Sequence, residues 1–206
     1  MKIHRLDIEY FALDMLESDN CENLTHKKVL PYLSVVQVLE GGYDITVGDQ
    51  PQQHIQNGGF FIASSGMQQE ITHHMNPDSG RMRARWLFLD AVFNKTLRFD
   101  SCYDFPVVLP EEYREILHAA FEKLFSSDSL FQKYSCCYTV MDILTKAGKR
   151  TMNPVNEPML RVFEFIRQNY RRPIKISDLA NEVNMSESNF YPIFKKYFGL
   201  PPLSYI

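Results

Sequence analysis

The spacing of apolar residues between positions 176 and 198 constrains the fold of this chain more than any other feature. Two apolar stripes at helical spacing flank Asn184-Met185-Ser186, formed by Leu179, Ala180 and Val183 before it and by Phe190, Ile193, Phe194 and Tyr197 after it. Asn is the common non-glycine residue at a left-handed turn position. Ser186 suits a helix N-cap, and Gly199-Leu200-Pro201-Pro202 predicts a helix end. The pattern therefore predicts two short helices joined by a tight turn.

Further residues around this turn favour a helix-turn-helix. Small Ala180 lies where the two helices must approach closely, and Ser177 is placed to cap the first of them. A third helix is predicted upstream, ending near Pro173, with an apolar face formed by Met159, Val162, Phe163, Ile166 and Tyr170. Lys195 and Lys196 lie near the end of the last helix, where they can reach DNA phosphates.

The first half of the chain predicts short strands instead of helices. β-Branched and alternating apolar segments are separated by Gly, Asn and Ser turns, as in Gly41-Gly42 and Asn57-Gly58-Gly59. The predicted strands cover residues 32–39, 43–47, 53–55, 59–63, 67–73 and 83–93. Short strands at this spacing indicate a β-sandwich or a small barrel.

After Pro110 the spacing of apolar residues changes to that of helices. Pro110 itself suits the first turn of a helix. Two amphipathic stripes, separated by Ser126-Ser127-Asp128-Ser129, predict a helical hairpin that ends at Gly148. The stripes either only cover the sheet or also supply a dimer surface. The second interpretation predicts an interface that includes Phe121, Leu124, Phe131, Tyr134, Tyr138 and Met141. Residues 149–158 lack apolar periodicity and hold two prolines, which predicts a linker.

Charge and cysteine content exclude several classes of protein. The net charge of −3 argues against a nucleic-acid-binding polycation, although residues 157–206 hold seven basic and five acidic side chains. No apolar run approaches the ~18 residues that span a bilayer, so we expect no membrane partner. The N-terminus has no apolar signal core. The four cysteines lack C-x-x-C spacing, and we expect a cytoplasmic protein with reduced cysteines.

The C-terminal pattern resembles one known family. The segment Leu179-Ala180-x-x-Val183-Asn184-Met185-Ser186-x-Ser188-x-Phe190-x-x-Ile193-Phe194-Lys195-Lys196-x-Phe198-Gly199-x-Pro201-x-x-Tyr205-Ile206 resembles the first helix-turn-helix of the AraC/XylS family of bacterial transcription regulators. Earlier segments resemble the effector-binding cupin barrel of that family: Val38-Leu39-Glu40-Gly41-Gly42, Asn57-Gly58-Gly59-Phe60 and Ser64-Ser65-Gly66. The resemblance implies an α+β fold, in which a cupin-like β-barrel and an α-helical hairpin precede a small all-α helix-turn-helix subdomain.

The resemblance also implies a domain plan and a set of partners. We expect a cupin-like effector-sensing barrel over 1–107, a dimerisation hairpin over 108–148, a linker over 149–158 and half of a DNA-binding domain over 159–206. The implied partners are double-stranded DNA, a small-molecule effector and a second copy of the chain, with RNA polymerase as a further candidate. Because a family member holds a second helix-turn-helix that this sequence lacks, we interpret the chain as truncated and expect weak DNA binding.

Two sets of site residues follow from the resemblance. The recognition helix would present Ser188, Asn189, Tyr191 and Pro192 toward bases and Lys195 and Lys196 toward phosphates. Family members often carry a basic residue at the position of Pro192. The effector-binding candidates are aromatic and polar residues of the barrel, namely Gln37, Tyr43, Arg85, Trp86 and Phe88. Arg85 and Trp86 are adjacent on a strand, so at most one of them points inward.

The sequence argues against an enzyme and against a metal cofactor. Cupin enzymes need a His-x-His pair after the glycine turn, and residues 43–48 contain no His. The family position that sometimes keeps a His is Gln69 here, and adjacent His73 and His74 cannot both enter one barrel. We therefore expect no catalytic residue, no cofactor and no bound metal. The alternative to a DNA-binding regulator is a ligand-sensing or dimerisation cupin module with little DNA binding of its own.

Overall fold

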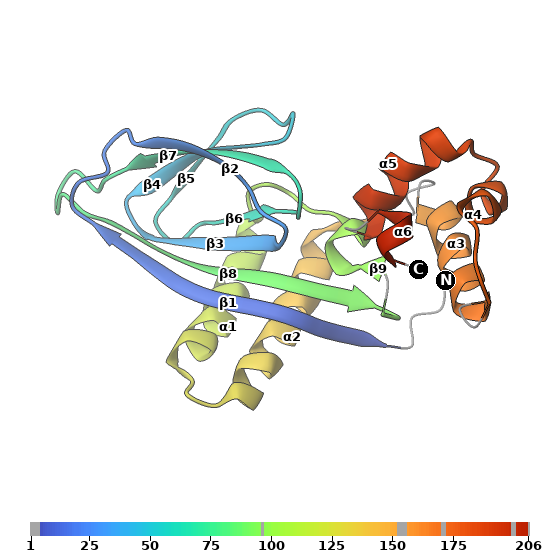
Figure 1. Ribbon diagram of the computed structural model, residues 1–206. Coiled ribbons are helices and arrows are strands. Elements are labelled where there is room, and N and C mark those ends of the chain that lie inside the picture. Colours follow the sequence, from blue (N-terminus) through green and yellow to red (C-terminus); the bar gives the residue numbers. More distant parts are fainter. Residues whose placement is uncertain (1–4, 96, 152–155, 170–171, 199–200, 206) are drawn as a thin grey trace.

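The computed structural model describes residues 5–95, 97–151, 156–169, 172–198 and 201–205. Strands fill the first half of the chain and helices the second, as the change in apolar period predicts. Two sheets and a helical hairpin form three layers, and the C-terminal helices lie at one end of them (Figure 1). The described residues include no helix that is long and apolar enough to cross a membrane.

The larger sheet is antiparallel and places its two longest strands side by side. Its order is β1-β8-β3-β6, and β9 pairs with β8. The bounds are β1 Leu6–Ser18, β3 Leu33–Glu40, β6 Phe60–Ala63, β8 Met82–Phe93 and β9 Leu97–Arg98. One face of this sheet packs on the hairpin and the other on the second sheet. Both of its faces are therefore buried, which explains the apolar character of residues 33–38.

The smaller sheet packs face to face on the larger one. Its order is β2-β7-β4-β5, with β2 Thr25–Val29, β4 Gly42–Val47, β5 Gln53–Gln56 and β7 Gln68–His74. The apolar core between the sheets includes Val36, Val38, Ile45, Ile55 and Ile71. The two sheets share no hydrogen-bonded strand pair among the described residues, so the predicted barrel takes the form of two packed sheets.

β1 was not predicted from the sequence, although it makes the most extensive strand pairing in the fold. Its register with β8 shifts between Ile8 and Tyr10, which marks a β-bulge. A bulge reverses which residues face the core, so Ile8 lies on the buried face before it and Phe11 and Leu13 after it. The alternation of apolar and polar residues that marks a strand is lost there. Four acidic residues in the segment weaken its apolar pattern further.

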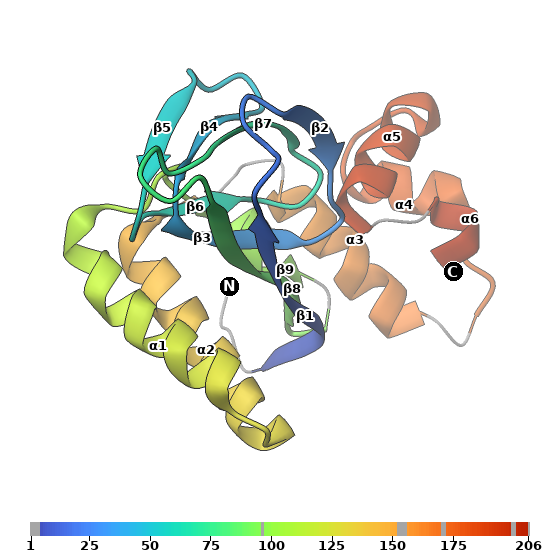
Figure 2. The same cartoon turned by 90° about the vertical axis from the view of Figure 1, so that its left-hand side faces the viewer.

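The helical hairpin covers the outer face of the larger sheet (Figure 2). A 3-10 turn at Glu111–Tyr113 follows Pro110, and the hairpin consists of α1 Arg114–Ser126 and α2 Leu130–Ala147. Leu117, Phe121 and Leu124 of α1 are fully buried against the sheet. Each such side chain contributes about 1.5–3 kcal/mol on burial, so the hairpin is part of the core of this domain.

The burial of the hairpin changes the argument for a dimer surface. Three residues of the predicted interface, Phe121, Leu124 and Met141, are at most 1% exposed within one chain. Tyr134 is partly buried on the same core. Phe131 and Tyr138 remain 88% and 40% exposed, and Ile116 and Leu130 join them as exposed apolar side chains. The exposed apolar surface is thus smaller than the sequence count indicates.

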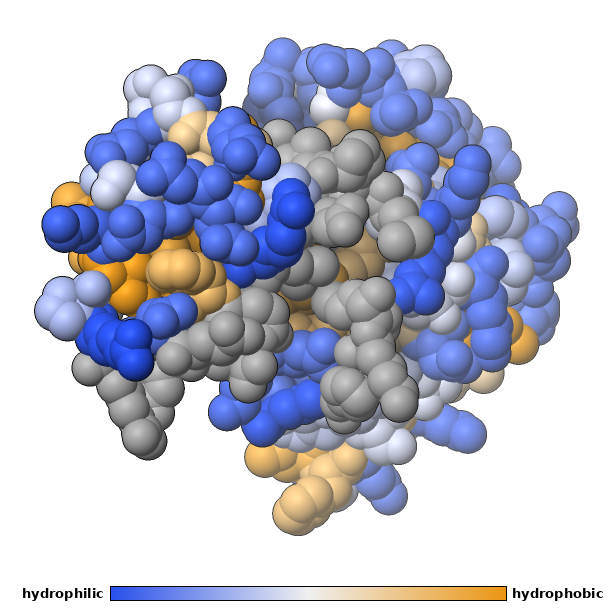
Figure 3. Space-filling view, turned by 90° about the vertical axis from the view of Figure 1, so that its right-hand side faces the viewer, coloured by the Kyte–Doolittle hydropathy of each residue, from blue (hydrophilic) through white to orange (hydrophobic). Residues whose placement is uncertain are grey.

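The C-terminal helices form a separate small core. They are α3 Asn156–Asn169, α4 Ile176–Glu182, α5 Glu187–Phe198 and the short α6 Pro202–Tyr205. Their buried side chains are Met159, Val162, Ile166, Ile176, Leu179, Ala180, Val183, Phe190 and Phe194. Among the residues that Figure 3 colours by hydropathy, hydrophilic side chains predominate on this face, and an apolar protrusion at its lower edge lies at the loop end of the hairpin.

Several predicted boundaries differ from the structure. α4 begins at Ile176 with Lys175 as its N-cap, so the prediction of Ser177 as the cap is wrong. The carboxylate of Asp178 accepts a hydrogen bond from the Lys175 backbone N–H at 3.3 Å and stabilises this start. Within the expected linker 149–158, β11 Lys149–Arg150 pairs with β10 Tyr103–Asp104, and α3 begins at its other end. Residues 152–155 and Tyr170 lie outside the described residues.

Pro192 generates a stability prediction, because it lies inside α5 with an exposed side chain. Proline has no N–H to donate to the Ser188 carbonyl, and a proline in a helix interior costs up to about 3 kcal/mol. We expect Pro192→Arg to raise the melting temperature of the chain, measured by circular dichroism. Asn189→Arg adds the same charge on the same helix without removing a proline, and it serves as the control. An unchanged or lower melting temperature for Pro192→Arg would show that α5 has already absorbed the strain.

Candidate functional site

The turn between α4 and α5 has the geometry that the sequence predicts. Asn184 has a φ of 54°, in the left-handed region. The Met185 backbone N–H donates to the Ala180 carbonyl at 2.9 Å and closes the turn. Ser186 caps α5, since its Oγ accepts from the Asn189 backbone N–H at 3.4 Å. Ala180 is 1% exposed, so a larger side chain there would push the helices apart.

This turn fixes how α5 presents its surface. Phe190 and Phe194 face the small core and are fully buried. Of the residues predicted to face DNA, Ser188, Asn189, Pro192 and Lys195 are exposed, and Tyr191 is half-buried. The Ser188 hydroxyl lies 3.1 Å from that of Ser186. The side chain of Lys196 lies outside the described residues. The exposed face of α5 therefore offers hydroxyl, amide and ammonium groups, which can bond base edges and phosphates.

The five effector-binding candidates divide between two faces of the larger sheet. Tyr43 is buried between the sheets, and Trp86 is half-buried against the same core. Phe88 lies two residues beyond Trp86, hence on the same face, with ring centroids 6.1 Å apart. Arg85 and Gln37 instead face the hairpin, where both bond to residues of α1. The expectation that Arg85 and Trp86 point opposite ways is confirmed, and Trp86 is the one that faces the other sheet.

The space between the sheets also holds polar side chains that sequence analysis did not select. Ser34, Gln69 and His73 are at most 6% exposed and share strand faces with the apolar core residues. The Ser34 hydroxyl, both amide atoms of Gln69 and Nδ1 of His73 have no hydrogen-bond partner among the described residues. Buried polar groups are normally hydrogen-bonded. These groups are therefore the ones that a ligand between the sheets would satisfy.

Strand register gathers several of these residues at one end of the interior. Ser34 pairs with Phe88 across β3 and β8, and Gln69 pairs with Lys28 across β7 and β2. The two pairs belong to facing sheets, and the Lys28 Nζ lies 5.9 Å from the Phe88 ring centroid. Burial lowers the pKa of Lys28. This end therefore combines an aromatic wall with amide, hydroxyl and amine groups.

His73 is electrically neutral at physiological pH in this setting. Burial, together with smaller contributions from charge repulsion by His26, Lys28 and His74, lowers the pKa of His73 to about 4. Its ring packs edge-on against Tyr43, with centroids 4.9 Å apart. Its Nε2 lies 3.3 Å from Nδ1 of His26, whose pKa burial also lowers. His73 can therefore offer a ligand either an N–H donor or a nitrogen acceptor.

A polar network on the opposite face ties the sheet to α1. Arg85 is 5% exposed and donates from Nε to Oε1 of Gln37 at 2.8 Å. Its terminal nitrogen donates to Oε1 of Glu122 at 2.7 Å. The Gln37 amide nitrogen lies 2.9 Å from Nδ1 of His118. The guanidinium also packs over two aromatic rings of α1, at 5.7 and 5.0 Å. Gln37 and Arg85 thus hold α1 on the sheet instead of lining the inter-sheet space.

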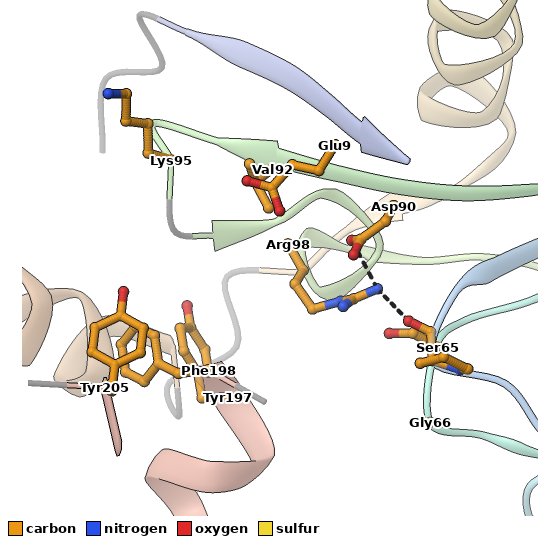
Figure 4. Close-up of a pocket in the computed structure, with 11 residues that line it drawn as sticks. Glu9, Ser65, Gly66, Asp90, Val92, Lys95, Arg98, Tyr197, Phe198 and Tyr205 are labelled. Atoms are coloured by element: carbon orange, nitrogen blue, oxygen red, sulfur yellow. Dashed lines mark hydrogen bonds and ion pairs between the residues drawn. The ribbon is translucent and has the colours of Figure 1, made fainter. Parts of the chain in front are cut away.

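A cavity of about 440 Å³ lies where the C-terminal helices meet the sheets. Strand and loop residues including Glu9, Asp90 and Arg98 form one side, and the other side is formed by Tyr197, Phe198 and Tyr205 (Figure 4). Arg98 forms ion pairs with Asp90 at 3.2 Å and with Asp100 at 3.3 Å. Burial raises the pKa values of both tyrosine hydroxyls. The Tyr197 hydroxyl has no hydrogen-bond partner among the described residues.

Comparison with known proteins identifies the C-terminal unit. A sequence model described as bacterial regulatory helix-turn-helix proteins, AraC family, matches residues 166–206. This segment is an AraC-family helix-turn-helix. The resemblance read from the sequence is thereby confirmed. The match includes α4, the turn at Asn184 and α5, which are the elements whose geometry is described above.

Other known proteins resemble larger parts of the chain at lower similarity. The lactose operon transcription activator of Staphylococcus xylosus is 26% identical over 166 residues, which cover 74% of this chain and 58% of that protein. The AraC-like transcriptional activator CuxR is 14% identical with a TM-score of 0.47, covering 88% of this chain and 69% of CuxR. The Schizosaccharomyces pombe Cnp3 cupin domain is 15% identical with a TM-score of 0.34, covering 43% and 63%. The family match and the curated relative support a transcription regulator.

Strand periodicity could have found the missed interior residues. Ser34 precedes the buried Val36 by two positions, and Gln69 and His73 flank Ile71 at the same spacing. The face of the sheet on which each of these side chains lies could therefore be predicted once the strands were assigned. The partners of Arg85 and Gln37 could not be predicted in this way, because Glu122 and His118 lie on a helix far along the chain. Their position depends on how the hairpin packs.

Proposed function

We propose that this chain is an effector-responsive bacterial transcription regulator that binds promoter DNA through α5. The observation that carries the proposal is the AraC-family helix-turn-helix, whose α5 exposes Ser188, Asn189 and Lys195 beside a buried core. The alternative is a ligand-sensing or dimerisation module with little DNA binding of its own. Pro192 favours that alternative, because it stands where a basic residue would add a base or phosphate contact.

DNA binding is tested with fragments from upstream of the chain's own gene. Titration by fluorescence anisotropy is expected to show weak binding, because one helix-turn-helix reads one segment of the major groove. Lys195→Ala should weaken binding to all fragments and reduce the salt slope by about 1. Asn189→Ala should lower the preference for one fragment over another, by about 1–3 kcal/mol if it reads a base pair.

Lys123→Ala is the matched control for the DNA titration. Lys123 is an exposed lysine on α1, so its loss changes the net charge equally without altering α5. We expect this variant to bind DNA as the wild-type chain does. Equal loss of binding in Lys123→Ala and Lys195→Ala, or no DNA binding at any fragment, would favour the sensing module without DNA binding.

The proposed effector is a small hydroxyl-rich molecule, such as a sugar. The Gln69 amide nitrogen, the Gln69 amide oxygen and the Ser34 hydroxyl have no partner among the described residues. A ligand with hydroxyl groups can both accept and donate, so it would satisfy all three. Trp86 and Phe88 offer flat apolar faces beside them. The similarity to a lactose operon activator agrees with this chemical class.

Effector binding is measurable through Trp86, which is the chain's single tryptophan. We expect one or more sugars of a panel that includes lactose, galactose and glucose to change its fluorescence saturably. Gln69→Leu should lower the affinity for that sugar about tenfold, the equivalent of ~1.4 kcal/mol. The same variant should retain or gain stability, because it removes unpaired buried amide atoms.

The exposed Gln56 supplies a control for the fluorescence experiment. Gln56→Leu makes the same chemical change on β5 and should leave sugar binding unchanged. A fluorescence response that persists in Gln69→Leu, or that no sugar produces, would contradict the proposed site.

A second copy of the chain is the proposed partner of the hairpin. Ile116, Leu130, Phe131 and Tyr138 are exposed on it, and Phe131 is 88% exposed. We expect light scattering to report a dimer at micromolar concentration and Phe131→Glu to shift it to the monomer. Leu203→Glu adds the same charge at a 72% exposed position on α6 and should leave the dimer intact. A wild-type monomer, or a dimer indifferent to Phe131→Glu, would contradict this interface.

A further inference from the structure

Three potential metal ligands meet on the outer face of the smaller sheet, away from the inter-sheet interior. Asp44 on β4 pairs directly with His54 on β5. His74 on β7 lies diagonal to Asp44, two positions beyond its direct partner Thr72. The neighbouring Tyr43 and His73 face the interior, so alternation along β4 and β7 turns Asp44 and His74 outward.

Both imidazoles bond to the same carboxylate. Nδ1 of His54 lies 2.7 Å from Oδ1 of Asp44, and Nε2 of His74 lies 2.9 Å from Oδ2. One ligand atom from each of the three residues lies within 4.8 Å of the others. Partial burial alone would raise the pKa of Asp44, but hydrogen bonds from the two histidines lower it overall. Asp44 is thus ionised at neutral pH, as a metal ligand must be.

We propose that Asp44, His54 and His74 form a binding site for Zn²⁺ or a similar divalent transition metal. Two imidazole nitrogens and one carboxylate oxygen are common ligands of Zn²⁺, with metal–ligand bond lengths of about 2.0–2.2 Å. A tetrahedral ion would hold its ligand atoms about 3.3 Å apart, by the geometry of those bond lengths. The observed contacts of 2.7 and 2.9 Å would lengthen slightly to admit it, and the two imidazole nitrogens, which lie within 4.8 Å of each other, would take the same separation. Water would complete the coordination, because the His54 side chain is 49% exposed.

Glu22 is placed to orient one of these ligands. Its Oε1 lies 3.7 Å from Nδ1 of His74, the ring nitrogen that does not face Asp44. Its Oε2 accepts a hydrogen bond from the Met75 backbone N–H at 2.6 Å, which holds the carboxylate beside the end of β7. A metal-bound histidine commonly donates its second N–H to a carboxylate in this way. Glu22 is a positioning residue in the proposed site.

The site differs from the one that the sequence argument excluded. The missing His-x-His pair argues against a metal inside the barrel, where His73 and His74 cannot both point because they lie on opposite faces of β7. On the outer face, β5 brings His54 beside the outward-facing His74, with ring centroids 5.7 Å apart. The sequence led us to expect no bound metal anywhere on the chain, and the proposal of a site at Asp44, His54 and His74 departs from that expectation.

Competition with a chromophoric chelator tests the site on the purified chain after metal removal. We expect one equivalent of Zn²⁺ per chain. His54→Ala and His74→Ala should each lower the affinity for Zn²⁺ at least tenfold, and Glu22→Gln should lower it by a smaller factor. His118→Ala is the matched control, because the His118 side chain is also 49% exposed but lies outside the cluster. It should leave Zn²⁺ affinity unchanged.

A second readout separates loss of metal from loss of fold. Without Zn²⁺, each variant should give the wild-type circular dichroism spectrum. If the alanine variants unfold, Asp44→Asn replaces them in the test, because it keeps the shape of the side chain. Adding Zn²⁺ should raise the melting temperature of the wild type and of His118→Ala, but not that of His74→Ala or Asp44→Asn. Absence of stoichiometric binding, or equal affinity in wild type, His54→Ala and His74→Ala, would overturn the proposal.

Discussion

The hydrogen bonds of the buried Arg85 guanidinium hold the helical hairpin on the larger sheet, and the arrangement of these two layers depends on them. The guanidinium bonds to Gln37 on β3 and to Glu122 on α1, and it lies beneath two aromatic rings of α1. Removing one partner from a buried ion pair typically costs about 3–5 kcal/mol. The Glu122 side chain is 56% exposed, so solvent screening makes the cost here smaller than that. Moving α1 away from the sheet would leave this cation with only Gln37.

This interaction makes β8 a strand with two distinct roles. Arg85 on one face holds the hairpin, and Trp86 on the other face borders the inter-sheet interior. A ligand that changes the position of Trp86 therefore acts on the strand that carries Arg85. Such a ligand can shift the conformation only if it binds two states with different affinities. Such a shift would reach the proposed second copy through the hairpin, and it would reach the C-terminal helices through the cavity beside Tyr197 and Arg98.

The sequence predicted those features that depend on local spacing. The turn at Asn184, the cap at Ser186 and the buried Phe190 and Phe194 all follow from residues within one helical turn of each other. The strand order, β1 and the Arg85 network depend on contacts between distant residues. The bulge near Ile8 removes the alternation by which a strand is recognised, so no local pattern identified β1.

Candidate site residues were harder to assign than elements for the same reason. Gln37 and Arg85 are polar residues on strands, as ligand-binding residues often are. Only the packing of α1 shows that they bond to the hairpin and not to a ligand. The outward cluster of Asp44, His54 and His74 needs the pairing of three strands, which spacing along the chain does not give. Alternation alone assigns a face to each residue, but it does not identify the neighbour across the sheet.

Coupling between the two faces of β8 is tested most directly by amide hydrogen exchange, with and without the sugar that changes Trp86 fluorescence most. Exchange is expected to slow in β3 and β8 and also to change in α1, residues 114–126, which the ligand does not touch. In Arg85→Met the change in β8 should persist and the change in α1 should be lost. Protection confined to the strands in the wild type, or an identical α1 response in Arg85→Met, would contradict the coupling.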